Sequence, residues 1–204
     1  MSQQPLPKSF YDRDTQVVAS ELLGCQLVIT ADQQRIAAKV VETEAYLGEA
    51  DLACHASHGR TKRNDAMYGP PGSAYIYFVY GMHYCFNVVT LGEGTPHAVL
   101  IRAAQPVCGL GQMRTNRRNP RTGKTPSDTD LTNGPAKLCQ AMGIDGRFNR
   151  SDLGGNTLSI IGGNSVPDSE ISTGPRTGID YAGSWRYEPL RYWLTDNSYV
   201  SKQP

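Results

Sequence analysis

Long apolar segments are absent from this chain of 204 residues, and no run of about 18 apolar residues could form a membrane-spanning helix. The opening residues, MSQQPLPKSFYDRD, also lack the basic and apolar regions of a signal peptide. We therefore expect no membrane partner. The expected location is the cytoplasm, at the nucleoid, in a bacterium, or the nucleus in a eukaryote.

Cysteine is scarce, scattered and odd in number. The five cysteines show no C-x-x-C spacing, which argues against both a disulfide framework and a zinc site. Four of them stand in apolar surroundings, where a free cysteine behaves as a small hydrophobe, so buried thiols are expected. A phosphate-cradling glycine motif is absent as well. The sequence thus predicts no metal and no cofactor.

A strong net charge is also lacking, since 20 basic residues balance 19 acidic ones and leave +1 at pH 7. The basic residues are unevenly spread. Arg114 to Lys124 carries five of them and no acidic residue, and Arg60, Lys62 and Arg63 form a second cluster. Local stripes of this kind can bind a polyanion such as nucleic acid. Solvated loops are the competing interpretation of both clusters.

What the chain does contain fits one soluble domain over residues 1–204, with residues 1–12 expected to be flexible. Strand-like segments separated by turn residues predict hairpins. We predict an α+β fold, in which a curved, largely antiparallel β-sheet carries packed helices and a protruding β-hairpin. The expected strands are 25–30, 35–46, 74–80, 84–90, 97–107, 158–161 and 189–194, and the expected helices are 15–23 (capped by Asp14), 109–117 and 134–142 (capped by Asn133).

The segment from Val41 to Asn87 concentrates the unusual residues of the chain. Carboxylates lie within its strand-like start, VETEAY, and five tyrosines fall within the seventeen residues from Tyr68 to Tyr84. Period-two alternation places Glu42, Glu44 and Tyr46 on one face of that strand. An ordinary solvent-facing strand has the same alternation. The density of polar and aromatic groups nevertheless favours an active site.

Several segments along the chain resemble those of a known family. It is similar to the alkyladenine (3-methyladenine) DNA glycosylases in the segments VVETEAYLG, AYIYFVYGMHYCFN, VLIRAAQP, NGPAKLCQAMGI and RTGIDYAG. The similarity extends from about Phe10 to Leu194. ETEAY followed nine residues later by a histidine, with YxYxxYGM downstream, is a specific combination. Enzymes of this class rotate a nucleotide out of the duplex to reach its base.

The resemblance implies a catalytic role for two of these residues. Glu44 would deprotonate or orient the water that attacks C1′ of the flipped nucleotide, and its charge would favour the oxocarbenium-like sugar. Arg102, alone in an apolar strand, would hold Glu44 and the water. Structural ion pairing is the competing interpretation for Arg102, because a buried arginine needs a partner in any case. Glu42 has no catalytic counterpart in the family.

The resemblance also implies a pocket that holds the flipped base. Tyr46 would stack on one face of the base and His55 and Tyr77 on the other, with Tyr75 bonded to His55. Asn87 would line the floor and exclude the exocyclic amino group of guanine. Ordinary core aromatics, and an asparagine bonded to nearby backbone, are the competing interpretations of these positions.

Beyond the pocket, the resemblance implies a set of DNA contacts. Tyr80 at the hairpin tip would fill the gap left by the flipped nucleotide, with Met82 and His83 beside it. His83 departs from the family pattern known to us, which has a tyrosine there. The candidate phosphate contacts are Arg60, Lys62, Arg63 and Lys137.

Taken together, these implications predict a monofunctional glycosylase acting as a monomer on double-stranded DNA. Lysine is absent from the segments that would line the pocket, so Schiff-base chemistry is not expected. The expected substrates are 3-methyladenine, 7-methylguanine, hypoxanthine and ethenoadenine, whose removal would start base excision repair. The alternative is a non-catalytic DNA lesion-binding module of the same fold. A hydrolase of free nucleosides is disfavoured, because it would not use a wedge hairpin and basic loops.

Overall fold

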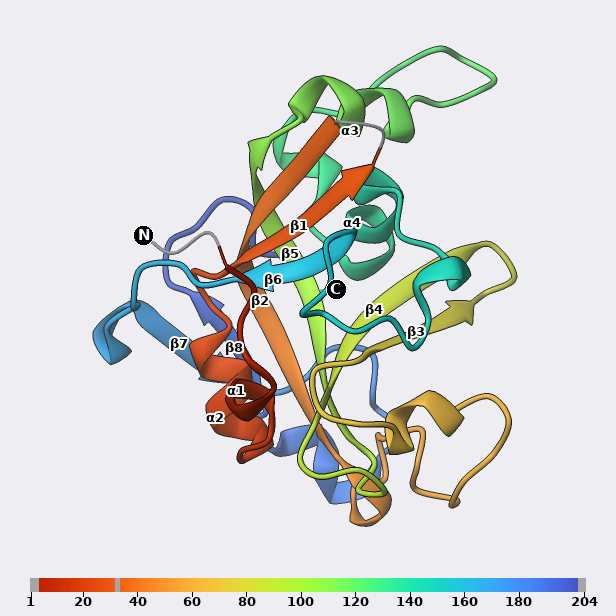
Figure 1. The fold of residues 1–204 in the computed structure, drawn as a ribbon, viewed down its shortest axis with the longest axis vertical. Coiled ribbons are helices and arrows are strands. Elements are labelled where there is room, and N and C mark those ends of the chain that lie inside the picture. Colours follow the sequence, from red (N-terminus) through yellow and green to blue (C-terminus); the bar gives the residue numbers. More distant parts are fainter. Residues whose placement is uncertain (1–3, 32–33, 202–204) are drawn as a thin grey trace.

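The computed structural model describes residues 4–31 and 34–201 and is organised around one β-sheet (Figure 1). The strand order is β3-β4-β5-β2-β1-β6, and β8 pairs with both β2 and β7. All of these pairs are antiparallel, which confirms the predicted mixed α+β domain. The strands are β1 (Gln26–Ala31), β2 (Gln34–Leu47), β3 (Ala74–Val79), β4 (His83–Thr90), β5 (His97–Cys108), β6 (Leu158–Ile161), β7 (Ile171–Gly174) and β8 (Arg191–Leu194).

Helices cover the sheet at several points. In α2, the Asp14 carboxylate accepts hydrogen bonds from the backbone N–H groups of Gln16 (2.9 Å) and Val17 (3.1 Å), so the predicted N-cap is present. The Thr43 hydroxyl of β2 donates to the Ala19 carbonyl of that helix at 2.8 Å. The α-helices of the described residues are α1 (Lys8–Tyr11), α2 (Thr15–Glu21), α3 (Leu110–Arg117) and α4 (Pro135–Met142), and the short 3-10 helices are Gly48–Ala50, Asp65–Tyr68, Thr129–Leu131, Gly146–Phe148, Asp168–Glu170 and Gly183–Tyr187.

The long strands β2 and β5 lie side by side in the centre of the sheet (Figure 1). Their register shifts around Glu42, where the strict two-residue alternation is interrupted. Glu42 and Glu44 nevertheless remain on one face, because both reach Arg102 of β5. Every residue from Val41 to Ala45 is buried, so the alternative of a solvent-facing strand is wrong.

Three local features differ from the sequence-based expectations. Gly134 takes the N-cap position of α4 without a side-chain bond, whereas Asn133 bonds to Asp130 and Lys137, so the predicted Asn133 cap is wrong. Strand β7 lies in a segment that was expected to be turns, and it pairs only with β8. β8 itself begins at Arg191, two residues later than expected.

The N-terminal segment also differs from the expectation. Pro5 forms a bridge with Ile161, and the backbone N–H of Leu6 donates to the Ile160 carbonyl at 2.8 Å. Tyr11, in α1, is only 1% exposed and belongs to the main hydrophobic core. Residues 5–12 are therefore packed against the domain rather than loose, while residues 1–3 lie outside the described residues.

The cysteines are mostly buried. Cys25, Cys54, Cys85 and Cys139 are buried, as expected for thiols in apolar surroundings, and Cys108 is exposed. Within the described part of the chain, no helix is long and apolar enough to cross a membrane. The β3–β4 hairpin projects from the body of the domain (Figure 1).

Candidate active site

A pocket of about 350 Å³ opens beside the β3–β4 hairpin. Its walls come from β2, the segment between β2 and β3, the strands β3, β4 and β5, the start of α4 and the loop before Ala182. The pocket-lining residues include Tyr46, His55, Tyr75, Tyr77, Asn87 and Arg102, which were all expected at one site, together with Arg63, Tyr80 and His83. A volume of this size is within the range of pockets that bind small organic molecules.

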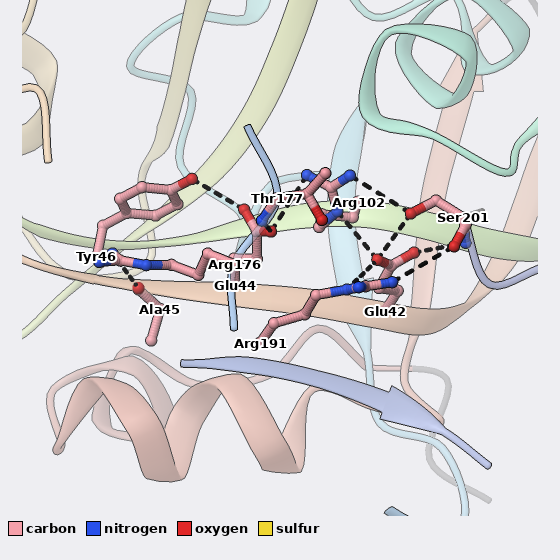
Figure 2. Close-up of polar contacts among 9 residues, drawn as sticks. All are labelled: Glu42, Glu44, Ala45, Tyr46, Arg102, Arg176, Thr177, Arg191 and Ser201. Atoms are coloured by element: carbon pink, nitrogen blue, oxygen red, sulfur yellow. Dashed lines mark hydrogen bonds and ion pairs between the residues drawn. The ribbon is translucent and has the colours of Figure 1, made fainter. Parts of the chain in front are cut away.

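Glu44 lies directly behind this pocket and has no exposed surface. Its Oε1 accepts a hydrogen bond from the backbone N–H of Thr177 (2.7 Å) and lies 3.3 Å from Nη1 of Arg102. Its Oε2 accepts from the Tyr46 hydroxyl at 2.8 Å (Figure 2). All three partners line the pocket, whereas Glu44 itself does not. A carboxylate has about four acceptor positions. One position on Oε2 is therefore left without a donor from the described residues.

Glu42, two residues earlier, has different surroundings. Its carboxylate accepts four hydrogen bonds: from Nε of Arg102 (3.0 Å), Nε of Arg191 (2.7 Å), and the backbone N–H (2.7 Å) and hydroxyl (2.8 Å) of Ser201 (Figure 2). Neither Arg191 nor Ser201 lines the pocket. Glu42 thus accepts three of its four hydrogen bonds on Oε1 and one on Oε2, and it neutralises two buried guanidinium groups.

Arg102 joins the two carboxylates. Its Nε is bonded to Glu42 and its Nη1 faces Glu44, so the expected contact with Glu44 is present but is shared. Burial alone would lower the pKa of Arg102, but Glu44 and Glu42 outweigh it and the pKa is raised. The guanidinium therefore stays charged. Arg102 therefore forms a structural ion pair with Glu42 and also presents a positive charge to the pocket.

Tyr46 is fixed by a second buried ion pair, between Arg176 and Asp51. Both side chains are 0% exposed, and Nη2 of Arg176 donates to Oδ1 of Asp51 at 2.8 Å. Arg176 also donates to the Ala45 carbonyl at 2.9 Å, and its Cζ lies 4.7 Å from the centre of the Tyr46 ring. Asp51 in turn accepts from the backbone N–H of Leu47 (3.0 Å). The pair thereby holds the end of β2 in place.

The opposite wall consists of His55, Tyr75 and Tyr77. Nδ1 of His55 lies 2.8 Å from the Tyr75 hydroxyl, which is the bond that the family resemblance implied. The ring centres of His55 and Tyr77 are 4.5 Å apart at 77°, an edge-on arrangement. The two rings therefore do not form one flat platform.

The protonation of this wall follows from the side chains packed around it. Loss of hydration, and then the nearby Arg63, lower the pKa of His55 to about 4, although the residue is exposed and lines the open pocket. Burial raises the pKa of Tyr75, which therefore keeps its proton near neutral pH. Between a neutral His55 and a protonated Tyr75, the hydroxyl can donate to Nδ1 or accept from it, according to the tautomer of the ring.

Asn87 in β4 lines the pocket and is 3% exposed. Its Nδ2 donates to the Tyr75 carbonyl at 3.0 Å, so the backbone-bonded asparagine considered as an alternative is present. That bond does not remove Asn87 from the pocket. The bond uses one of the two N–H donors of the amide, so the second N–H and the carbonyl oxygen can both be offered to a ligand.

The hairpin tip carries the three residues expected to contact DNA. Tyr80 is 87% exposed with a φ of 53°, a left-handed conformation that is uncommon for a residue with a side chain. Met82 is 68% exposed, and His83 is half-buried at the pocket rim. A large aromatic and a large thioether side chain thus stand free at the end of the hairpin.

The four candidate phosphate contacts have different surroundings. Arg63 lines the pocket and Lys62 is exposed beside it. Nε of Arg60 lies 2.6 Å from Asp65, and Nζ of Lys137 is bonded to Asn133 at 2.8 Å and lies 3.6 Å from Asp130. Arg63 donates one long hydrogen bond, to the Phe78 carbonyl at 3.5 Å, and neither it nor Lys62 is paired with a carboxylate among the described residues, whereas Arg60 and Lys137 are already neutralised in part.

Several residues of this site were not predicted from the sequence. Arg176 and Thr177 belong to the RTGIDYAG segment, but no role had been assigned to them. Asp51 stands in a polar turn, where a carboxylate gives no signal of burial. Arg191 and Ser201 lie 149 and 159 residues from Glu42, and no local pattern connects them to it. Among the described residues, no three His, Cys, Asp or Glu side chains come together as a metal site.

Comparison with known proteins finds relatives over nearly the whole chain. The family model of methylpurine-DNA glycosylase (MPG) matches residues 9–198. A protein of Myxococcus xanthus is 49% identical, with 98% of this chain and 94% of the relative aligned. One of Carboxydothermus hydrogenoformans is 49% identical (97% and 99% aligned), and one of Methanocella arvoryzae is 44% identical (97% and 96%). All three carry the provisional name 3-methyladenine DNA glycosylase. The chain therefore belongs to the methylpurine-DNA glycosylase family.

Proposed function

We propose that this protein is a monofunctional DNA glycosylase that removes alkylated or deaminated purines from double-stranded DNA. The candidate substrates are 3-methyladenine, 7-methylguanine, hypoxanthine and ethenoadenine. Removal of such a base would leave an abasic site and start base excision repair. The enzyme would act as a monomer, at the nucleoid of a bacterium or in the nucleus of a eukaryote.

The observation that carries this proposal is the position of Glu44. It is a buried carboxylate with one open acceptor position, and it lies behind a pocket with aromatic walls. A carboxylate in this setting can orient a water molecule and take its proton. A module that only binds DNA would have no use for a buried negative charge close to the phosphates of its ligand.

The reaction assigned to the site is hydrolysis at C1′ of a flipped nucleotide. The water oxygen would form a bond to C1′ while the bond from C1′ to the base nitrogen breaks. The electron pair of that bond leaves with the base, and the water proton passes to Glu44. Because Glu44 has no exposed surface, water would enter only between Tyr46, Arg102 and Thr177. Such shielding would keep other waters from the reacting sugar.

The pocket walls support base flipping as part of the proposal. Tyr46 on one wall, and His55 and Tyr77 on the other, provide faces and edges for stacking, which contributes about 1–3 kcal/mol per base. A neutral His55 adds no repulsion toward cationic lesions such as 3-methyladenine and 7-methylguanine. Arg63 and Lys62 would contact the phosphates near the flipped nucleotide.

A duplex oligonucleotide with one hypoxanthine tests the proposed activity. The protein is incubated with the labelled duplex, which is then treated with hot alkali and analysed by gel. We expect strand breakage only after alkali, because a monofunctional enzyme leaves the sugar–phosphate backbone intact. An identical duplex without the lesion serves as control. Tight binding without any breakage would favour the lesion-binding module instead.

Tyr80 provides a test of the flipping step. We expect Tyr80→Ser to weaken binding to the hypoxanthine duplex about tenfold, because the ring would no longer fill the gap in the stack. Fluorescence anisotropy measures this affinity, in a Glu44→Gln background that prevents turnover. Tyr187→Ser is the matched control, since Tyr187 is also an exposed tyrosine (66%) but does not line the pocket. Equal affinity of the Tyr80 and Tyr187 variants would remove Tyr80 from the wedge role.

A further inference from the structure

The hydroxyl of Tyr46 has a contact that stacking on a base does not require. It donates to Oε2 of Glu44 at 2.8 Å, and it is the one donor from the described residues on that oxygen (Figure 2). Burial, followed by the charge of Glu44, raises the pKa of Tyr46 well above its usual value. The hydroxyl therefore keeps its proton and acts only as a donor to the carboxylate.

The ring that carries this hydroxyl is held from behind. Arg176 lies over the ring at 4.7 Å, is itself buried, and does not line the pocket. The opposite ring face is consequently the one that a base can cover. Because a hydroxyl lies in the plane of its ring, a base stacked above that plane leaves the bond to Glu44 intact.

The opposite oxygen of Glu44 is fixed as well. Oε1 accepts from the backbone N–H of Thr177 and faces Arg102, while Oε2 accepts from Tyr46. Both oxygens of the carboxylate are therefore held only while the Tyr46 hydroxyl is present. Loss of the hydroxyl would free Oε2 without changing either contact of Oε1. The direction of the last open acceptor position therefore depends on Tyr46.

We propose that the Tyr46 hydroxyl is a positioning group for catalysis, which holds Oε2 of Glu44 so that its open acceptor position meets the attacking water. This inference rests on the proposed glycosylase function and adds to the stacking role of the ring. The proton of the hydroxyl stays on Tyr46 throughout. The water proton passes to the open position of Oε2.

A conservative variant separates the hydroxyl from the ring. Tyr46→Phe keeps the stacking surface and removes one donor. We expect the rate of hypoxanthine release, measured with enzyme in excess over the duplex, to fall about tenfold, which is the usual effect of one charge-assisted hydrogen bond. The affinity for the lesion duplex should stay within about twofold, because the stacked faces are unchanged.

The pH profile gives a second measurement that does not depend on the fraction of active protein. A donor to a carboxylate favours its charged form, so the acid limb of the rate profile should move to higher pH in Tyr46→Phe. Other titratable or charged groups that act on Glu44 are present in both proteins, so they cannot produce the difference. They are Arg102 on β5, Tyr77 on β3, Cys85 on β4 and Arg176 in the C-terminal loop.

Tyr192→Phe is the matched control. Its hydroxyl is bonded to Gln16 at 3.3 Å, away from the pocket, so this variant also loses one partly buried hydroxyl and should release the base at the wild-type rate. A Tyr46→Phe rate equal to or above wild type overturns the inference. So does a loss of affinity that accounts for the whole effect. Absence of release by the wild-type protein would instead contradict the proposed function.

Discussion

Glu44→Gln is expected to reduce the release of hypoxanthine about a thousandfold, while binding of the lesion duplex changes by only a few-fold. Loss of a general base costs about 10²- to 10⁴-fold in rate. Glutamine cannot accept the proton of the water and provides no charge for the developing sugar cation. Single-turnover excision and anisotropy with the same duplex measure the two quantities separately.

The structure indicates that this variant will fold. A glutamine can still accept from the backbone N–H of Thr177 through its oxygen, and its nitrogen can donate to the Tyr46 hydroxyl. Arg102 keeps its bond to Glu42 and is not left unpaired. Glu49→Gln is a suitable control, because Glu49 is close in sequence, is bonded to Tyr68 at 3.1 Å and does not line the pocket. Release at the wild-type rate by Glu44→Gln would refute the proposed mechanism.

The sequence predicted the parts of this site that depend on local patterns. Two-residue alternation placed Glu44 and Tyr46 on the same face, and the contact between their side chains agrees with it. Aromatic content and a short turn predicted the hairpin that carries Tyr80. Family resemblance supplied Arg102 and the His55–Tyr75 pair, which spacing alone could not have connected.

The parts that could not be predicted depend on contacts over long distances in the chain. Arg176 meets Asp51 across 125 residues, and only the folded sheet brings them behind Tyr46. Strand β7 has few apolar residues and forms because β8 offers it an edge. Asn133 was expected to cap α4 from its residue type. The side-chain oxygen of Asn133 instead accepts a hydrogen bond from the ammonium group of Lys137.

The surroundings of Glu42 were the hardest to predict from the sequence, because its partners Arg191 and Ser201 lie near the far end of the chain. We expect Glu42→Gln to lower the free energy of unfolding by about 3–5 kcal/mol, the usual cost of leaving buried charges uncompensated. Arg102 is 8% exposed and Arg191 is 2% exposed, and both direct Nε at the same oxygen of Glu42. In the variant, only Glu44 would remain close to this pair of guanidinium groups.

Thermal unfolding followed by circular dichroism measures the effect. For a domain of this size the expected loss corresponds to a fall in Tm of roughly 6–20 °C. Glu21→Gln is the control, because it removes an exposed ion pair with Arg13 (side chains 49% and 36% exposed) and should change stability by less than about 1 kcal/mol. If Glu42→Gln unfolded at the same temperature as this control, the two buried arginines would have another source of compensation. The outcome expected here assigns separate tasks to two glutamates on one strand face. Glu42, bonded to Arg191 and Ser201 away from the pocket, would stabilise the fold, and Glu44, whose three partners all line the pocket, would act on water.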